Sequence, residues 1–198
     1  MRVVGLDFGT THSSIALYEG HGAPRLASFP AGAGREGRTP AFRSIRHFEP
    51  DPDERRRPPR VRAGPAAIDR YLATAGDGRL VQSIKSFLAS ALFERTEIFG
   101  ATYELEDLVG RLVSELRVAA ERELGPLGTR VVVGRPVRFA GDPATADERL
   151  ALARLRSALA RAGFEVAINY SRSETAAKET EAQARQAGAQ TLLVKCDV

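Results

Sequence analysis

The chain has 198 residues, of which 43% are hydrophobic and 27% charged, a composition that predicts a folded domain and excludes a disordered tail. Its net charge of +4 comes from basic residues spread along the sequence, so we do not expect nucleic acid as a partner. No apolar run approaches the ~18 residues of a membrane helix, no signal peptide is expected at the start, and the single cysteine is Cys196; these features predict a cytoplasmic protein.

The first thirty residues predict a meander of β-strands. Residues 3–8 form a nearly continuous apolar run with a carboxylate, Asp7, near its end, which is typical of a buried strand. Residues 9–12 predict a turn, residues 14–18 a returning strand, and residues 25–29 a third strand after a further turn. A strand is therefore expected after the turn, where many nucleotide-binding folds begin a helix.

The middle of the chain predicts a mixture of strands and helices. A loop rich in glycine and arginine is expected at residues 32–38 and a strand at 42–48. Residues 65–73 predict a helix that begins with a proline, whose missing N–H is harmless at that position. Apolar residues at helical spacing favour a further helix over residues 80–92, and a hairpin is expected around Gly100.

The clearest helical pattern covers residues 105–124, where leucines recur every three to five positions and acidic residues occupy the start. Gly125 predicts its end. A short buried strand is expected at residues 130–134 and a helix at about 147–162. The last 33 residues predict a strand–helix–strand unit over residues 166–170, 175–187 and 191–198.

The turn at residues 9–12 carries groups that suit a phosphate ligand. The preceding strand brings the carboxylate of Asp7 to its end, and Gly9 lets the backbone turn sharply so that successive N–H groups face one point. Thr10 and Thr11 add hydroxyl donors, and a carboxylate suits Mg²⁺ or its waters. A P-loop and a Rossmann glycine motif do not fit, because no Lys-Ser/Thr pair follows and no helix is expected there. A hairpin turn with a polar strand end explains the same residues without a ligand.

The segment Gly5-Leu6-Asp7-Phe8-Gly9-Thr10-Thr11-His12-Ser13 resembles the first phosphate loop of the superfamily of actin, sugar kinases and DnaK-type chaperone ATPases. Four later segments resemble the DnaK-type family in the same order. They are Arg38-Thr39-Pro40, residues 81–88 with Lys85, residues 103–108, and residues 131–139, whose Gly134-Arg135-Pro136 is closest to divergent bacterial DnaK-like proteins. The resemblance covers residues 3 to about 165.

This resemblance implies an ATP site. At matching positions, Asp7 would hold Mg²⁺ through water, and Gly9, Thr10 and Thr11 would cradle the β- and γ-phosphates. Lys85 would hold the γ-phosphate and orient the attacking water. Independently of the family, Lys85 is the only lysine before residue 166, and a compact ammonium ion suits a point contact that a guanidinium serves poorly. A lysine on a surface helix is the alternative interpretation.

The resemblance ends near residue 165. The family continues with Glu-Pro, a run of alanines and a glycine-rich second phosphate loop, but no Glu-Pro follows Phe164 and Gly188 is the only later glycine. Residue usage changes at the same point, because the only asparagine, the only cysteine and two of the three lysines lie in the last 33 residues. We therefore expect the second phosphate loop and the adenosine loop to be absent, and the two parts to have different origins.

The tail resembles the second β–α–β unit of short-chain dehydrogenases of the 3-oxoacyl-carrier-protein reductase type. The resemblance lies in residues 166–174, Gly188-Ala189 and residues 193–198. In that family Arg172 would face the 2′-phosphate of NADP and Asp197 the adenine. The glycine-rich turn and the Tyr-x-x-x-Lys pair of the family are missing, so we do not expect NADP to bind.

The sequence thus predicts an α/β protein with a partial actin-like, ribonuclease-H-like ATPase lobe at residues 1–165 and a Rossmann-like β–α–β tail at residues 166–198. The expected function is that of an ATP-binding or ATPase domain fragment of a DnaK-like molecular chaperone. The family implies ATP or ADP with Mg²⁺ as cofactors and client proteins or co-chaperones as partners; hydrolysis by this chain is left open by the missing loops. The alternatives are an NADP-dependent oxidoreductase fragment and a non-catalytic module that binds polyanions through the basic loop at residues 55–60. A fusion or gene-model join near residue 165, or a truncated and diverged DnaK-like protein, would each explain the sequence.

Overall fold

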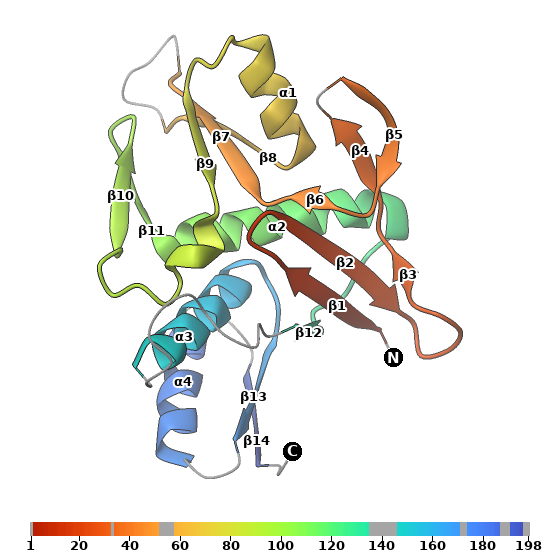
Figure 1. The fold of residues 1–198 in the computed structure, drawn as a ribbon. Coiled ribbons are helices and arrows are strands. Elements are labelled where there is room, and N and C mark those ends of the chain that lie inside the picture. Colours follow the sequence, from red (N-terminus) through yellow and green to blue (C-terminus); the bar gives the residue numbers. More distant parts are fainter. Residues whose placement is uncertain are drawn as a thin grey trace.

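The computed structural model describes residues 2–32, 34–51, 58–134, 146–170, 174–186 and 191–195. Within these ranges the protein is a mixed α/β fold, in which a mixed five-stranded sheet and several smaller sheets pack against helices (Figure 1). No helix in the described part of the chain is both long and apolar enough to cross a membrane.

The largest sheet is built around the first two strands. β1 (Val3–Phe8) pairs antiparallel with β2 (His12–Tyr18), and β2 also pairs with the short strands β3 (Arg25–Leu26) and β6 (Phe42–Arg43). β12 (Val131–Val133) lies on the other side of β1 and runs parallel to it. The predicted meander is confirmed, except that the expected strand at 25–29 is only two residues long and the chain then enters a separate hairpin.

One face of this sheet forms the core with the longest helix. Val4, Leu6 and Phe8 are buried and alternate with more exposed residues along β1, the pattern of a strand with one buried face. α2 (Leu105–Leu124) packs against this core and against α3 (Ala146–Arg161), and Figure 1 shows it crossing behind the β1–β2 hairpin. Both helices were predicted to within a residue or so of their observed bounds.

A second, three-stranded antiparallel sheet has the strand order β8–β7–β9. A helix and two hairpins surround it. The bounds are β7 (Ile45–Glu49), β8 (Arg60–Ala63), α1 (Pro65–Ala73) and β9 (Arg79–Gln82), with the hairpins β4 (Phe29–Gly32)–β5 (Arg35–Thr39) and β10 (Arg95–Ile98)–β11 (Ala101–Glu104).

The second sheet lies between two helices. His47 of β7 packs edge-on against Tyr71 of α1, with ring centroids 5.7 Å apart. The neighbouring residue, Arg46, points to the opposite face and forms a 3.3 Å ion pair with Glu115 of α2. Side chains alternate along a strand, so these two contacts place α1 and α2 on opposite faces of the sheet.

Two predictions for the middle of the chain are wrong. Residues 80–92 do not form a helix, because β9 ends at Gln82, Ser83 takes a left-handed conformation with φ of 57°, and only a 3₁₀ turn, η1 (Ile84–Phe87), follows. Pairing of β9 with β7 overrides the helical spacing of the apolar residues. Residues 32–38 are not a loop, because residues 35–39 form the second strand of the β4–β5 hairpin.

The hairpin predicted around Gly100 is confirmed. Phe99 and Gly100 have φ of 51° and 77°, and positive φ at both central residues is what a type I′ turn requires. The turn therefore connects β10 and β11 with the twist that an antiparallel pair needs.

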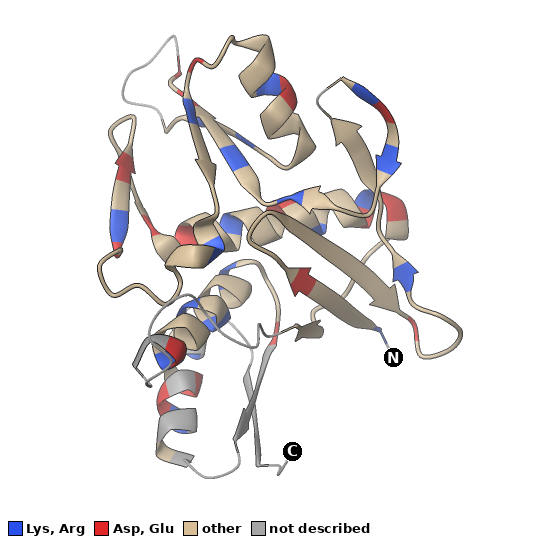
Figure 2. Cartoon of the chain, viewed as in Figure 1, with Lys and Arg blue, Asp and Glu red and all other residues tan. Residues whose placement is uncertain are grey.

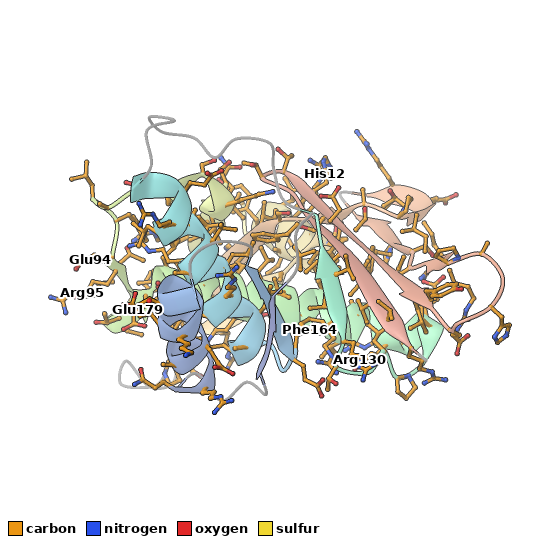
Figure 3. The ribbon with its side chains drawn as sticks, turned by 90° about the horizontal axis from the view of Figure 1, so that it is seen from below. His12, Glu94, Arg95, Arg130, Phe164 and Glu179 are labelled. Atoms are coloured by element: carbon orange, nitrogen blue, oxygen red, sulfur yellow. The ribbon has the colours of Figure 1, made fainter. Side chains whose placement is uncertain are left out.

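The C-terminal part forms a strand–helix–strand unit, as predicted. β13 (Val166–Tyr170) and β14 (Thr191–Lys195) are parallel, and α4 (Glu174–Gln186) connects them. Just before β13, the backbone N–H of Glu165 donates to the carbonyl of Thr129 at 3.0 Å, close to the residues labelled Arg130 and Phe164 in Figure 3. β13 then leaves the large sheet, so β12 stays at its edge and Val132 is 64% exposed, where the sequence predicted a buried strand.

Candidate functional site

The turn between β1 and β2 lies at the carboxyl end of two parallel strands. β1 ends at Phe8 and β12 ends at Val133, and the N–H of the next residue, Gly134, donates to the carbonyl of Leu6 at 3.0 Å. In Figure 3, β12 lies between Arg130 at one end of the sheet and the turn marked by His12 at the other. The carboxyl ends of parallel strands are the usual position of ligand sites in α/β sheets.

Gly9 is required by the tightness of this turn. A Cβ at position 9 would lie 2.0 Å from the carbonyl oxygen of His12, which no side chain can do. The N–H of Gly9 donates to Ser13 Oγ at 3.2 Å, and Ser13 Oγ lies 2.9 Å from Ser44 Oγ, both serines being buried. The Gly9 N–H is thus engaged inside the protein, so the donors that remain for a ligand belong to the next two residues.

Those two residues, Thr10 and Thr11, present donors that no described residue uses. Both are exposed, and no described residue forms a hydrogen bond with their N–H groups or their hydroxyls. The carbonyl of Thr11 accepts the N–H of Ser44 at 2.9 Å, which ties the turn to the segment between β6 and β7. Asp7 is exposed on β1 next to these donors. The turn therefore offers donors for an anion and a carboxylate for a cation.

Lys85 reaches this turn from 77 residues away along the chain. Its ammonium group donates to the carbonyl oxygen of Phe8, the last residue of β1, and lies 5.7 Å from the centroid of the Phe8 ring. Burial lowers the pKa of Lys85, and the negative charge of Asp7 opposes that shift. The structure thus brings together Asp7, Lys85 and the turn that follows β1. The phosphate site predicted from the sequence required these three features to lie near one another.

A buried arginine of α3 holds the segment that carries Lys85. Arg154 is 7% exposed, and its Nε lies 3.5 Å from a carboxylate oxygen of Glu106 on α2. Its two terminal nitrogens donate at 2.8–3.3 Å to four carbonyls that follow the lysine: those of Phe87, Leu88, Ser90 and Phe93. The sequence carries no signal for this role, because Arg154 is one of several arginines in the same predicted helix.

A second cation lies beside the turn and was also missed. Arg43 of β6 is directly opposite His12 of β2 in antiparallel register, so the two side chains lie on the same face of the sheet. Arg43 forms no ion pair with any other described residue. Only the pairing of β2 with β6 brings this arginine close to the turn, so no local pattern could have identified it.

The segment Arg38-Thr39-Pro40 contacts the region in a limited way. Arg38 donates to Ser28 and forms a 2.7 Å ion pair with Glu123 near the end of α2. The carbonyl of Pro40 instead accepts the hydroxyl of Ser14 at 3.1 Å, one strand away from Asp7. The arginine of this segment therefore serves packing between the β4–β5 hairpin and α2.

Several predicted residues lie outside the described part of the chain. These are Arg172 and Asp197, which the resemblance to short-chain dehydrogenases would place at NADP, together with residues 135–139 of the strand-and-proline segment and residues 55–57 of the basic loop at 55–60. Among the described residues, no group of three or more His, Cys, Asp or Glu side chains is arranged to hold a metal ion. No model of a known protein family matches the sequence.

Proposed function

We propose that the β1–β2 turn binds the phosphates of ATP or ADP together with Mg²⁺, and that residues 1–165 are part of an actin-like ATPase lobe of the DnaK type. The observation that carries this proposal is the contact of Lys85 with the Phe8 carbonyl, beside Asp7. A lysine that served only as a surface residue would have no reason to be partly buried against a strand end that bears a carboxylate. A positive charge at that position is what a triphosphate needs.

Each residue would have a distinct task. Thr10 and Thr11 would donate their N–H groups and hydroxyls to phosphate oxygens, and Lys85 would hold the γ-phosphate and orient the attacking water. Asp7 would bind Mg²⁺ through water, and the ion would supply positive charge to the phosphate oxygens. Phosphoryl transfer depends mainly on positioning and charge neutralisation, both of which these groups can provide.

The arrangement of the large sheet supports the actin-like interpretation. The chain forms antiparallel strands first, then crosses over through α2 and returns as β12, parallel to β1. This crossover places Asp7 and the end of β12 at one edge, where Gly134 already bonds to Leu6. The parallel β13–α4–β14 unit is the part that we assign to a Rossmann-like tail.

Affinity for nucleotide should be low. A nucleotide site holds its ligand from several sides, and the sequence lacks the second phosphate loop and the adenosine loop that would close this one. We therefore expect a dissociation constant no better than about millimolar, ~4 kcal/mol. The tail contributes only Arg172 and Asp197 towards NADP, so MgATP or MgADP should stabilise the chain more than NADPH.

Thermal-shift titrations of the full chain with MgADP, MgATP and NADPH test this function. Lys85→Met should lose most of the shift produced by MgADP. The matched control is Arg95→Gln, an exposed residue of β10 that Figure 3 shows far from His12, and it should keep the shift. An unchanged MgADP shift in Lys85→Met would mean that Lys85 is a surface lysine. A larger shift with NADPH, lost in Arg172→Ala, would place the function in the tail.

A further inference from the structure

The outer edge of β8 has unpaired backbone groups. β8 is the first strand in the order β8–β7–β9, so among the described residues only its inner edge has a partner strand. The N–H of Gly64 donates to the carbonyl of Ile45 at 3.0 Å, which fixes the phase of the antiparallel ladder. Because paired residues alternate between bonded and non-bonded, the N–H and C=O groups of Val61 and Ala63 point away from β7. No other described residue forms a hydrogen bond with these groups.

A cavity of about 410 Å³ runs along this free edge. Val61, Arg62 and Ala63 all line it. Successive side chains of a strand point to opposite faces, so three consecutive residues can border one cavity only if the cavity follows the edge of the strand. α1 and α2 form two of its walls, Phe29 and Pro30 of β4 also line it, and the ring of Phe42 packs closely on Gly64 at the end of β8.

The walls of the cavity are mainly apolar. Phe42 and Phe29 form an edge-to-face pair with centroids 5.1 Å apart, and on α2 the side chain of Val118 is 47% exposed. Positively and negatively charged side chains also line the cavity, and Figure 2 shows residues of both charges on α1 and α2. One of the lining residues, Glu115, forms an ion pair with Arg46. Balanced charges select neither an anion nor a cation, so backbone pairing and apolar contact define the ligand.

We propose that the groove between α1 and α2 binds an extended, apolar peptide segment of another protein, which adds a strand to the free edge of β8. The backbone of the peptide would pair with Val61 and Ala63 over a stretch of about 10 Å, at about 3.4 Å per residue. Strand addition of this kind derives its affinity from main-chain hydrogen bonds and its specificity from the side chains of the groove. Nucleotide binding at the β1–β2 turn is not required for it.

The recessed position of the edge decides between possible occupants. A second copy of the chain would have to present its own β8, which lies between the same two helices, and the helices of the two copies would collide before the strands could pair. A flexible extended segment has no such walls and can enter the groove. The occupant that fits is therefore a peptide segment and not a second β8.

The probe for this site is a fluorescein-labelled heptapeptide of alternating valine and threonine, titrated with the full chain and followed by fluorescence anisotropy. Its control carries N-methyl groups on the three central amides, which removes backbone donors and keeps every side chain. The first peptide should bind with a saturable signal, and the N-methylated peptide should bind about tenfold more weakly or worse. Equal binding of the two peptides, or no saturation up to about 1 mM, would overturn the proposal.

Two variants of Val61 test the pairing from the side of the protein. Val61→Pro removes the outward N–H and keeps the ladder with β7, because proline is tolerated on an edge strand when its N–H position faces away from the sheet. It should weaken binding about tenfold, whereas Val61→Thr, which keeps the N–H, should stay within about twofold. If circular dichroism shows that Val61→Pro does not fold, Val118→Asp gives the second test, since it places a charge on the α2 wall at an exposed position and should also weaken binding. Unchanged peptide binding in the folded variant would refute a peptide site. A dimer of the chain would refute it too, if it forms with rising concentration, persists in Val61→Thr and is lost in Val61→Pro or Val118→Asp.

Discussion

Replacing Arg154 by alanine should destabilise the protein by about 4 kcal/mol. Its guanidinium donates to four carbonyls of the segment after η1, and two of those hydrogen bonds are short, at 2.8 and 2.9 Å. A hydrogen bond from a charged donor contributes about 1.5 kcal/mol or more, so the two short bonds give about 3 kcal/mol. The buried aliphatic stem adds about 1 kcal/mol of apolar contact, and the two longer bonds are left out of the sum.

Urea denaturation followed by circular dichroism measures this loss. Arg149→Ala is the matched control, because Arg149 is exposed on the same helix, and it should change the free energy of unfolding by less than about 0.5 kcal/mol. Arg154→Lys keeps the charge but cannot reach several carbonyls at once, so its loss should lie between the two. A loss below about 1 kcal/mol in Arg154→Ala would refute the inference that Arg154 holds the segment that carries Lys85. A MgADP response that survives in full when Arg154 is replaced would refute it as well.

Three further predictions follow from single residues. Burial lowers the pKa of Lys85 below its ordinary 10.5. Between the lowered pKa and pH 10.5 the unfolded chain therefore binds more protons than the folded protein, and the free energy of unfolding should rise with pH. Lys85→Met should remove that rise, as measured by urea midpoints at different pH values. Gly9→Ala should cost about 2 kcal/mol or more because of the carbonyl across the turn, whereas Gly5→Ala, with no atom within 4 Å of its Cβ, should stay within about 0.5 kcal/mol by the same denaturation assay. The backbone N–H of Ser28 and, to a smaller extent, the side chain of Arg38 lower the pKa of Glu123 below its ordinary 4.5. The stability that Glu123 contributes is therefore fully present above pH 4.5 and is lost as the pH falls through the lowered pKa. Glu123→Gln should flatten the fall in the free energy of unfolding at acid pH.

The elements that could be predicted are those whose signals are local. α1 begins with a proline, α2 has a regular leucine spacing and stops at Gly125, and the β10–β11 turn has a glycine where a positive φ is needed. The helix predicted over residues 80–92 was wrong because β9 pairs with β7 in spite of the helical spacing of its apolar residues. This partner strand lies about thirty residues earlier in the chain. Hydrophobic periodicity shows which face of an element is apolar, and it carries no information about a partner strand that is distant in the sequence.

The candidate site divides in the same way. Asp7 and the two threonines were identified from a nine-residue segment, and Lys85 was identified by a family resemblance and by being the only lysine in its part of the chain. Arg43 was missed because it reaches the turn only through the pairing of β2 with β6. Arg154 was missed because three of the four carbonyls that it binds belong to residues 80–92, which were expected to form a helix, where those carbonyls would have had helical partners.

The sequence by itself determined the strand–turn–strand start, the positions of the long helices and the chemistry of the turn, because hydrophobic spacing, glycine and proline act over a few neighbouring residues. Tertiary structure alone decided where β9 lies, that β8 has no partner strand on its outer edge in the described part of the chain, and that an ammonium group from η1 meets the end of β1. These features depend on which strands pair and which carbonyls lack a partner. Such properties belong to contacts between distant residues, and no single stretch of the chain encodes them.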